Sequence, residues 1–564
     1  MSVRPSTPRG GAGTELLASV RELRAAIDAA PLPLDLPGTA GDREERGRVI
    51  DQLDDYLLPR LQARQAPMVV VVGGPTGAGK STLVNSLMDR PVSVSGVLRP
   101  TTRSPVLVCH PDDLAWFSSA QVLPALHRVD HPTTSHEDLQ VVPEPSALPG
   151  LAILDAPDFD SIDDDNRELA TRLLGAADLW LFVTSSARYA DQVPWQFFEQ
   201  ALGRELPVGV VMNRVPPHIR SRVAADLERR LAAHDVGADR TFYVEVGAVG
   251  ADGRLARTQV TALRSWLSTL AGDQRRRDAV VDQAVAGGVL RACRAALRVA
   301  DAVGPQVRAV SELLTTAERC YGEVGEQLTT ALSDGSLLRG DLAEAWRAYA
   351  GVDTGALDLA DSMALLRERV GNDDAESKAQ VDRLALALDT ALENLLVEHA
   401  ERAAQQASDA LRATASGEAL LRGSEEDLSR PARQLPKQVR RAVRAWRQEL
   451  VDRVGDDLPG GQGTPQNGAT GLAVALSLRA TSPAGATAAS GPGVAGLVAH
   501  ARDGMRGTLT ALLTAERDRY LAPVFGWQLA ADAPKRLRAA VRAVDGHRTN
   551  SMDQRRGIAP PVRA

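Results

Sequence analysis

The sequence predicts an α/β domain, with a mostly parallel sheet and helices on both faces, followed by a large all-α helical bundle or stalk. Three observations carry this prediction. Short apolar segments alternate with helical segments between residues 66 and 272, which is the pattern of a mostly parallel sheet. A glycine-rich loop joins the first of these strands to a helix. Beyond residue 273 the strand signals stop, and long segments rich in Ala, Leu, Arg and Glu follow, as expected of packed helices.

Composition places the chain in the soluble globular class. It has 564 residues, 44% hydrophobic and 24% charged, which is too long for one core and predicts two to four domains. The net charge of -7 indicates no particular partner. Three scattered cysteines, Cys109, Cys293 and Cys320, lack metal-site spacing and suggest a reducing cytosol. Residues 1–13 do not resemble a signal peptide, and no apolar run reaches eighteen residues, so we expect a cytoplasmic chain without a membrane span.

The α/β part is preceded by helical segments and contains a regular order of elements. We expect N-terminal helices over 14–30 and 43–64, separated by the proline-rich residues 31–37. Apolar, β-branched runs predict strands over 68–72, 105–109, 151–154, 179–184, 208–212 and 242–246. Helical segments lie between them, over 81–87, 166–177, 219–233 and 254–270. Residues 111–150 have the composition of a polar connection dotted with prolines.

The all-α part is predicted from helical periodicity over 342–370, 378–414, 436–454, 494–521 and 535–544. These patterns suggest four regions. They are N-terminal helices that join the stalk (1–65), the α/β domain (66–272), the helical stalk with a Gly/Ala-rich tip loop near 457–493 (273–546), and a basic flexible tail (547–564).

One motif identifies the chemistry of the α/β domain. Gly74-Pro-Thr-Gly-Ala-Gly-Lys80-Ser81 has the spacing of a phosphate-binding P-loop, and it lies between an apolar strand and a helix. Lys80 is the only lysine in the first 377 residues of an arginine-rich chain. A compact ammonium can thread a loop to reach β- and γ-phosphates, whereas a planar guanidinium is too wide. We therefore assign nucleotide binding here to Gly74, Thr76, Gly77, Ala78, Gly79, Lys80, Ser81 and Thr82.

Candidate Mg²⁺ ligands accompany the P-loop. Ser81 follows Lys80, and Asp155 follows the apolar run 151–154, where a carboxylate can hold Mg²⁺ or its water. Thr101 and Thr102 lie in the connection after the P-loop helix, where a threonine can close over Mg²⁺ and the γ-phosphate. An ordinary loop or N-cap threonine is the alternative. The predicted metal ligands are Ser81, Thr102 and Asp155.

The order P-loop, Thr101-Thr102-Arg103, Asp155-Ala-Pro157 and Asn213-Arg214 resembles the G domain of bacterial dynamin-like GTPases, which are related to Era-type GTPases. The segments 154–161, 177–184 and 188–195 resemble actinobacterial members that occur as paired relatives. The resemblance implies GTP as the substrate, Mg²⁺ as the cofactor and a P-loop G domain. It also implies a homodimer, or a heterodimer with a paired relative, formed through G domains that act at a membrane.

The chain departs from that pattern at several positions. Asp158 replaces the glycine of the usual Asp-x-x-Gly motif, so its carboxylate either faces Mg²⁺ or water, which we favour, or alters γ-phosphate sensing. Phe159 leaves no glutamine there to orient water. Asn213-Arg214 lacks the aspartate that pairs with guanine donors, so ATP stays an alternative. We expect Asn213, Arg214 and Ala248 to line the base; the predicted catalytic residues are Lys80, Thr101, Thr102 and Asp158.

Two basic segments are candidate surfaces for anionic lipid. Residues 436–454 combine a stripe of apolar residues with arginines, which suits either a lipid surface or a bundle core. Residues 535–564 have a net charge of +6, from eight basic and two acidic residues. Together with the Gly/Ala-rich residues 468–498, they suggest peripheral contact with the inner face of the cell membrane. Nucleic acid is an unlikely partner, because no zinc spacing or aromatic platform accompanies the charge.

Two other functions are compatible with the P-loop. An ABC-type or other ATPase is one, although Ala156 follows Asp155 where such ATPases carry glutamate, and no Leu-Ser-Gly-Gly-Gln signature occurs. A nucleotide-dependent scaffold that does not hydrolyse is the other, because Asp158 and Phe159 replace familiar switch residues.

Overall fold

The computed structural model describes residues 11–94, 104–119, 122–124, 126–159, 164–189, 195, 198–199, 202, 206–232, 234, 236–247, 249–250, 253–337, 339–351, 374–457, 470, 473 and 492–555. The chain forms two compact units. Unit 1 consists of Met1–Leu32, Ala40–Gly304 and Ala530–Ala564, and unit 2 consists of Pro33–Thr39 and Pro305–Leu529.

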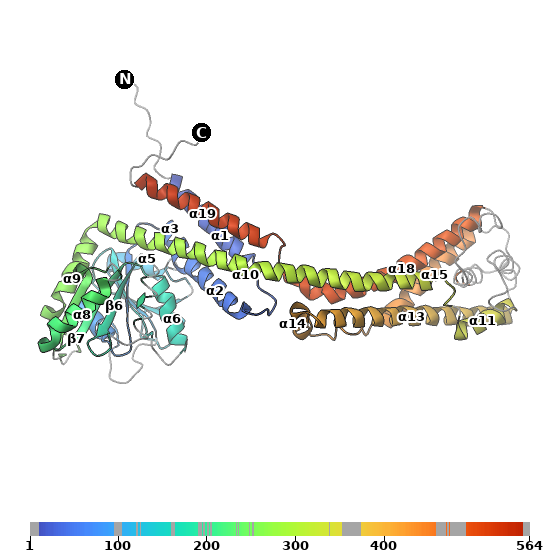
Figure 1. The fold of residues 1–564 in the computed structure, drawn as a ribbon, viewed down its shortest axis with the longest axis horizontal. Coiled ribbons are helices and arrows are strands. Elements are labelled where there is room, and N and C mark those ends of the chain that lie inside the picture. The colour runs from blue at the N-terminus through green and yellow to red at the C-terminus, as the bar shows by residue number, and fades with distance from the viewer. Residues whose placement is uncertain are drawn as a thin grey trace, which may run out of the picture. The chain divides into compact units, whose positions relative to one another are not determined.

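Unit 1 contains a sheet flanked by helices (Figure 1). Within the described residues it has eight strands in the order β3-β4-β2-β5-β1-β6-β7-β8. They are β1 (Met68–Gly73), β2 (Val106–Cys109), β3 (His127–Val129), β4 (Asp138–Pro143), β5 (Leu151–Asp155), β6 (Leu179–Ser185), β7 (Val208–Val215) and β8 (Thr241–Glu245). Every pairing is parallel except that of β2 with β5, which is antiparallel.

The central strands form because their residues are apolar on both faces. All residues of β1, β5 and β6 are buried, as expected of parallel strands covered by helices on both sides. The strands expected from the sequence are confirmed. The prediction for residues 111–150 was wrong in part, because β3 and β4 lie there. β3 has only three residues, none of them buried, so it carries no apolar run that sequence reasoning could detect.

The helices of unit 1 pack on the sheet and on one another. They are α1 (Gly11–Asp28), α2 (Thr39–Gln52), the π-helical η1 (Leu53–Leu57), α3 (Leu58–Gln62), α4 (Lys80–Met88), α5 (Leu114–Ser118), α6 (Asp164–Gly175), α8 (Arg220–Ala232), α9 (Arg257–Gly272) and α19 (Ala533–Arg555). Short 3-10 helices occur at η2 (Pro111–Asp113), η3 (Pro217–Ile219) and η4 (Ala238–Arg240). Residues near the two ends of the chain meet, because α1 packs against α19 (Figure 1).

The compact units divide the chain differently from the four predicted regions. The helices α1, η1 and α3 belong to the unit that contains the sheet, as do residues 274–304 and α19. The helix α19 extends through Arg555, into the segment 547–564 that we predicted as a flexible tail. The functional boundaries between the four regions stay a prediction.

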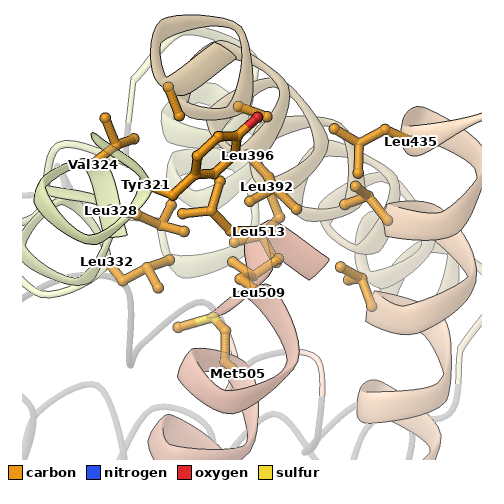
Figure 2. Packing of buried hydrophobic residues seen from close by; sticks show 14 of the residues in the cluster. Tyr321, Val324, Leu328, Leu332, Leu392, Leu396, Leu435, Met505, Leu509 and Leu513 are labelled. Carbon is orange, nitrogen blue, oxygen red and sulfur yellow. The ribbon is translucent and has the colours of Figure 1, made fainter. Parts of the chain in front are cut away.

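Unit 2 is a bundle of long helices. The helix α10 (Gln274–Ala331) enters it at Pro305, and the bundle continues with α11 (Gly340–Ala350), α13 (Ala375–Arg412), α14 (Ala415–Gly423), α15 (Leu435–Asp457) and α18 (Pro492–Gly526). Its core contains Tyr321 of α10, Leu392 and Leu396 of α13, and Leu509 and Leu513 of α18 (Figure 2). Such pairs, four residues apart, lie on one face of a helix and so form a continuous apolar stripe.

The apolar stripe of α15 belongs to that core. Val439, Val443, Trp446, Leu450 and Val454 are all buried. The sequence left two interpretations of this segment, and the packing supports a bundle helix, so the stripe is not exposed to lipid in this structure. The arginines are also partly engaged with acidic groups of α13, as in the ion pairs Arg440–Glu393 (3.3 Å) and Arg447–Asp389 (3.0 Å).

In the part of the chain that the structure describes, no helix is both long enough and apolar enough to cross a membrane. Cys109, Cys293 and Cys320 are buried and form no disulfide. Burial raises the pKa of the Cys109 thiol to about 11.

Candidate nucleotide-binding site

The P-loop connects β1 to α4, and two of its glycines adopt left-handed conformations. The φ angles of Gly77 and Gly79 are +77° and +90°, which L-residues with a Cβ rarely adopt. Gly74 is needed for a different reason, because a Cβ there would lie 2.0 Å from the carbonyl oxygen of Val183 in β6. These glycines therefore let the loop turn sharply at the carboxyl edge of the sheet, where the amides at the start of α4 can face an anion.

Lys80 begins α4 and is almost completely buried, with 5% of the residue exposed. Its ammonium folds back over the loop and donates hydrogen bonds to the carbonyl oxygens of Gly74 (2.9 Å) and Pro75 (3.5 Å). It also donates to Asp158 Oδ1. The ammonium is therefore held at the mouth of the loop, where the sequence analysis placed it.

Asp155 ends β5 beside the P-loop and is completely buried. Ser93 Oγ donates to its Oδ2 (2.6 Å), whereas its Oδ1 has no hydrogen-bond partner. Burial raises the pKa of Asp155, and hydrogen bonds from Ser81 and Ser93 and the charge of Lys80 partly oppose this. A buried carboxylate oxygen without a donor, next to a serine hydroxyl, is suited to a hard cation such as Mg²⁺. Asp155 and Ser81 therefore fit the expected metal site.

Asn213 fixes the end of β7 to the P-loop. Its amide Nδ2 donates to the carbonyl oxygen of Ala78 (2.8 Å), and its Oδ1 accepts from the backbone N–H of Arg214 (2.9 Å). The contact is close, because a Cβ on Gly79 would lie 2.5 Å from Asn213 Nδ2. Arg214 is in the left-handed region, with φ of +56°. The structure thus places Asn213 and Arg214, which we expect to line the nucleotide base, next to the P-loop.

Asp158 and Phe159 occupy positions that the sequence singled out as departures. We favoured an Asp158 that faces Mg²⁺ or water, but the structure places its carboxylate on Lys80. Phe159 is buried, with 4% exposed, and stacks on Phe182 with ring centroids 6.2 Å apart. It also meets Trp180 edge-on at 6.3 Å. Phe159 is therefore a core residue that fastens the segment after β5 to β6.

Arg188 is a site residue that sequence reasoning missed. Its Nη1 donates to the carbonyl oxygen of Thr76 in the P-loop (2.8 Å). The contact joins positions 112 residues apart, so no local pattern could have indicated it. It places a second cation on the loop whose carbonyls Lys80 already contacts. Thr101, Thr102 and Ala248, which we also assigned to the site, lie outside the described residues.

The comparisons with known proteins agree with this geometry. Residues 69–214 match the model of the Dynamin family. This part of the chain resembles the GTPase domain of the dynamin family. The match begins in β1 and ends at Arg214, so it includes the P-loop, Asp155, Asp158 and Asn213. The narrower resemblance to actinobacterial members stays a prediction.

Several solved structures resemble this chain distantly. One is described as an oligomerised bacterial dynamin pair that provides a mechanism for the long-range sensing and tethering of membranes. It is 11% identical, the alignment covers 97% of this chain and 96% of that chain, and the TM-score is 0.33. Another is Era in complex with MgGDPNP and nucleotides 1506–1542 of 16S ribosomal RNA. It is 16% identical, the alignment covers 36% of this chain and 56% of that chain, and the TM-score is 0.23. A third is Toc33 from Arabidopsis thaliana in complex with GDP and Mg²⁺. It is 18% identical, the alignment covers 45% of this chain and 97% of that chain, and the TM-score is 0.24. Comparison with curated proteins gave no match.

Proposed function

We propose that this dynamin-like GTPase binds GTP with Mg²⁺ at the P-loop and hydrolyses it there. One observation carries the proposal: Lys80, Asp155 and Asn213 lie at the carboxyl edge of the central, parallel part of the sheet. β1 leads into the loop of Lys80, β5 ends at Asp155, and β7 carries Asn213. In open α/β sheets this edge is where ligands bind.

The residues of this chain divide the work of phosphoryl transfer between them. The ammonium of Lys80 neutralises the β- and γ-phosphates, and the amides from Gly77 to Ser81 orient them. Ser81 and Asp155 would hold Mg²⁺, and the ion would supply positive charge next to the phosphates. We assign Thr101 and Thr102 to the closing switch. These roles place charge and position around the reacting phosphate without a covalent intermediate.

The match to the Dynamin family supports GTP as the substrate, and ATP remains the second candidate. Asn213 is held against Ala78 at 2.8 Å, and we assign its amide and the stem of Arg214 to contact with the base. Neither residue supplies a carboxylate for the guanine donors, and pairing those donors is the main source of discrimination. We also assign the backbone N–H of Ala248 to contact with the base.

We further propose that the protein acts as a dimer through its GTPase domains at a membrane surface. The match of residues 69–214 to the Dynamin family supports this assembly. The apolar stripe of α15 is buried, so we assign contact with lipid to exposed basic residues. Among these are residues of α19, although Arg538 is paired with Asp301 at 2.6 Å and Arg536 with Asp532 at 2.7 Å.

Turnover measurements test the proposal directly. We expect Mg²⁺-dependent release of phosphate from GTP at a higher kcat/KM than from ATP, and faster release when anionic vesicles of phosphatidylserine and phosphatidylcholine are added. A preference for ATP would replace the assigned substrate. Tight GTP binding with no phosphate release, with or without vesicles, would instead identify a nucleotide-dependent scaffold.

The role of Asp155 is tested by Asp155→Asn. This change keeps the shape of the side chain but removes the charge that attracts Mg²⁺. We expect the Mg²⁺ concentration for half-maximal turnover to rise at least about tenfold, which is the effect of weakening a metal's protein ligands. Asp112→Asn, at a side chain that is 82% exposed, is the matched control and leaves the titration unchanged. Superimposable Mg²⁺ titrations for Asp155→Asn and the wild type would remove Asp155 from the metal site.

A further inference from the structure

The ammonium of Lys80 has three N–H donors, and the structure engages all of them. Two donate to the carbonyl oxygens of Gly74 and Pro75, and the third donates to Asp158 Oδ1. A carboxylate oxygen and a phosphate oxygen are the same kind of anionic acceptor for an ammonium. We propose that Asp158 competes with the β- and γ-phosphates of the nucleotide for Lys80 and thereby lowers the nucleotide affinity of the site. This inference rests on the function proposed above.

The competition follows from charge and burial. The side chains of Lys80 and Asp158 are only 4% and 11% exposed, so their attraction is screened less than that of a surface pair. Asp155 lies close enough that the charge of Asp158 contributes to raising its pKa. A phosphate that arrived with Asp158 still on Lys80 would bring a third anionic group to the same place, and like charges repel strongly where water is excluded. The carboxylate must therefore leave Lys80 when phosphate binds.

The neighbouring residue keeps the carboxylate within reach of Lys80. Phe159 stacks on Phe182 at 6.2 Å and meets Trp180 at 6.3 Å. Both partners lie on β6, which pairs with β1 directly under the P-loop. Because Phe159 fixes the backbone next to Asp158, the carboxylate leaves by rotation of its own side chain. When a nucleotide dissociates, the same side chain can return to the ammonium.

The competition depends on which phosphates a ligand carries. In P-loops the lysine contacts the β- and γ-phosphates, whereas loop amides hold the α- and β-phosphates. Asp158 therefore lowers the affinity for GDP and GTP, but it has no effect on GMP, which lacks a β-phosphate. This pattern separates a competitor at Lys80 from a residue that shapes the base or ribose pocket, because the latter would change all three affinities together.

The test compares full-length wild type with Asp158→Asn and Asp158→Gly by calorimetric titration of GDP, GTP and GMP, with EDTA present so that Mg²⁺ plays no part. A hydrogen bond between charged groups contributes enough that its removal changes an equilibrium about tenfold or more. We expect both variants to bind GDP and GTP at least about tenfold more tightly, with GMP unchanged. Asp130→Asn, at a 99% exposed side chain next to the edge strand β3, controls for net charge and leaves every affinity unchanged.

Thermal unfolding provides a second readout. Without added nucleotide, Asp158→Asn should unfold at a lower thermal midpoint than wild type, because Lys80 loses its anionic partner. Adding GDP should raise the midpoint of the variant by more than it raises that of wild type. Equal GDP affinity in wild type and both variants would overturn the competition while leaving the GTPase assignment intact. Weaker binding by the variants would assign Asp158 to holding the nucleotide instead. If neither wild type nor variants bind guanine nucleotide, the proposed function itself fails.

Discussion

Lys80→Ala is expected to abolish GTP binding and turnover. The ammonium is the buried positive charge that the P-loop encloses, held by the carbonyl oxygens of Gly74 and Pro75. Truncating one partner of a buried, hydrogen-bonded charge pair costs about 2–5 kcal/mol, which corresponds to a loss of about 30-fold to several thousandfold in affinity. Fluorescence titration with a labelled GTP and a phosphate-release assay measure both quantities.

Lys80→Arg separates charge from shape. The guanidinium keeps the positive charge, but it is planar and wide, whereas the Lys80 side chain is 4% exposed in a tight loop. We therefore expect almost the same loss as for alanine. Lys378→Ala, at an exposed lysine of α13, is the matched control and keeps full activity. Normal turnover in Lys80→Ala would place the nucleotide elsewhere in the chain.

Disruption of the buried Arg60–Asp178 pair is expected to have the largest effect on stability. Asp178 accepts hydrogen bonds from Tyr56 Oη (2.9 Å), Arg60 Nε (3.0 Å) and the backbone N–H of Val69 (2.8 Å). Arg60 and Asp178 are 6% and 1% exposed. The cluster ties η1 and α3 to β1, the strand that leads into the P-loop.

Arg60→Met should therefore destabilise unit 1 by about 3–5 kcal/mol, because it leaves the Asp178 carboxylate buried without a cation. Urea denaturation followed by circular dichroism measures the change, and hydrogen exchange of peptides from β1 assigns it to unit 1. The double variant Arg60→Met/Asp178→Leu should recover part of the loss, since an apolar pair needs no compensating charge.

A surface pair provides the comparison. Arg276→Met removes an ion pair with Asp273 in which the arginine side chain is 64% exposed. Exposed pairs contribute little, so the change in stability should stay below about 1 kcal/mol. Similar losses for Arg60→Met and Arg276→Met would show that burial does not govern the Arg60–Asp178 interaction.

The elements that could be predicted are those with local signals. In the α/β domain, β1 is a run of apolar residues and the P-loop motif is contiguous; in the helical bundle, α13 repeats leucines at helical spacing. Short windows of sequence were therefore enough. β3 was missed because this edge strand has no buried residue. β4 was missed because its buried stretch Leu139-Gln-Val141 is short and interrupted by a polar residue. The extent of α19 was missed because its packing partner, α1, lies at the other end of the chain.

The candidate site divides in the same way. Lys80, Ser81, Asp155 and Asn213 could be predicted as site residues because each belongs to, or follows, a recognisable strand or motif. The partners of these residues were not found. The carboxylate of Asp158 on Lys80 and the guanidinium of Arg188 on Thr76 join positions 78 and 112 residues apart, and nothing in the sequence indicates which distant groups meet.

By itself, the sequence determined that this protein has a P-loop on a parallel sheet and a long helical region, because spacing and apolar periodicity are properties of neighbouring residues. Only the tertiary structure decided that Asp158 contacts the lysine, that Phe159 is a core residue, and that the stripe of α15 faces a bundle. Each of these depends on side chains from separate elements competing for the same buried space, and burial is what makes their charges and apolar surfaces count.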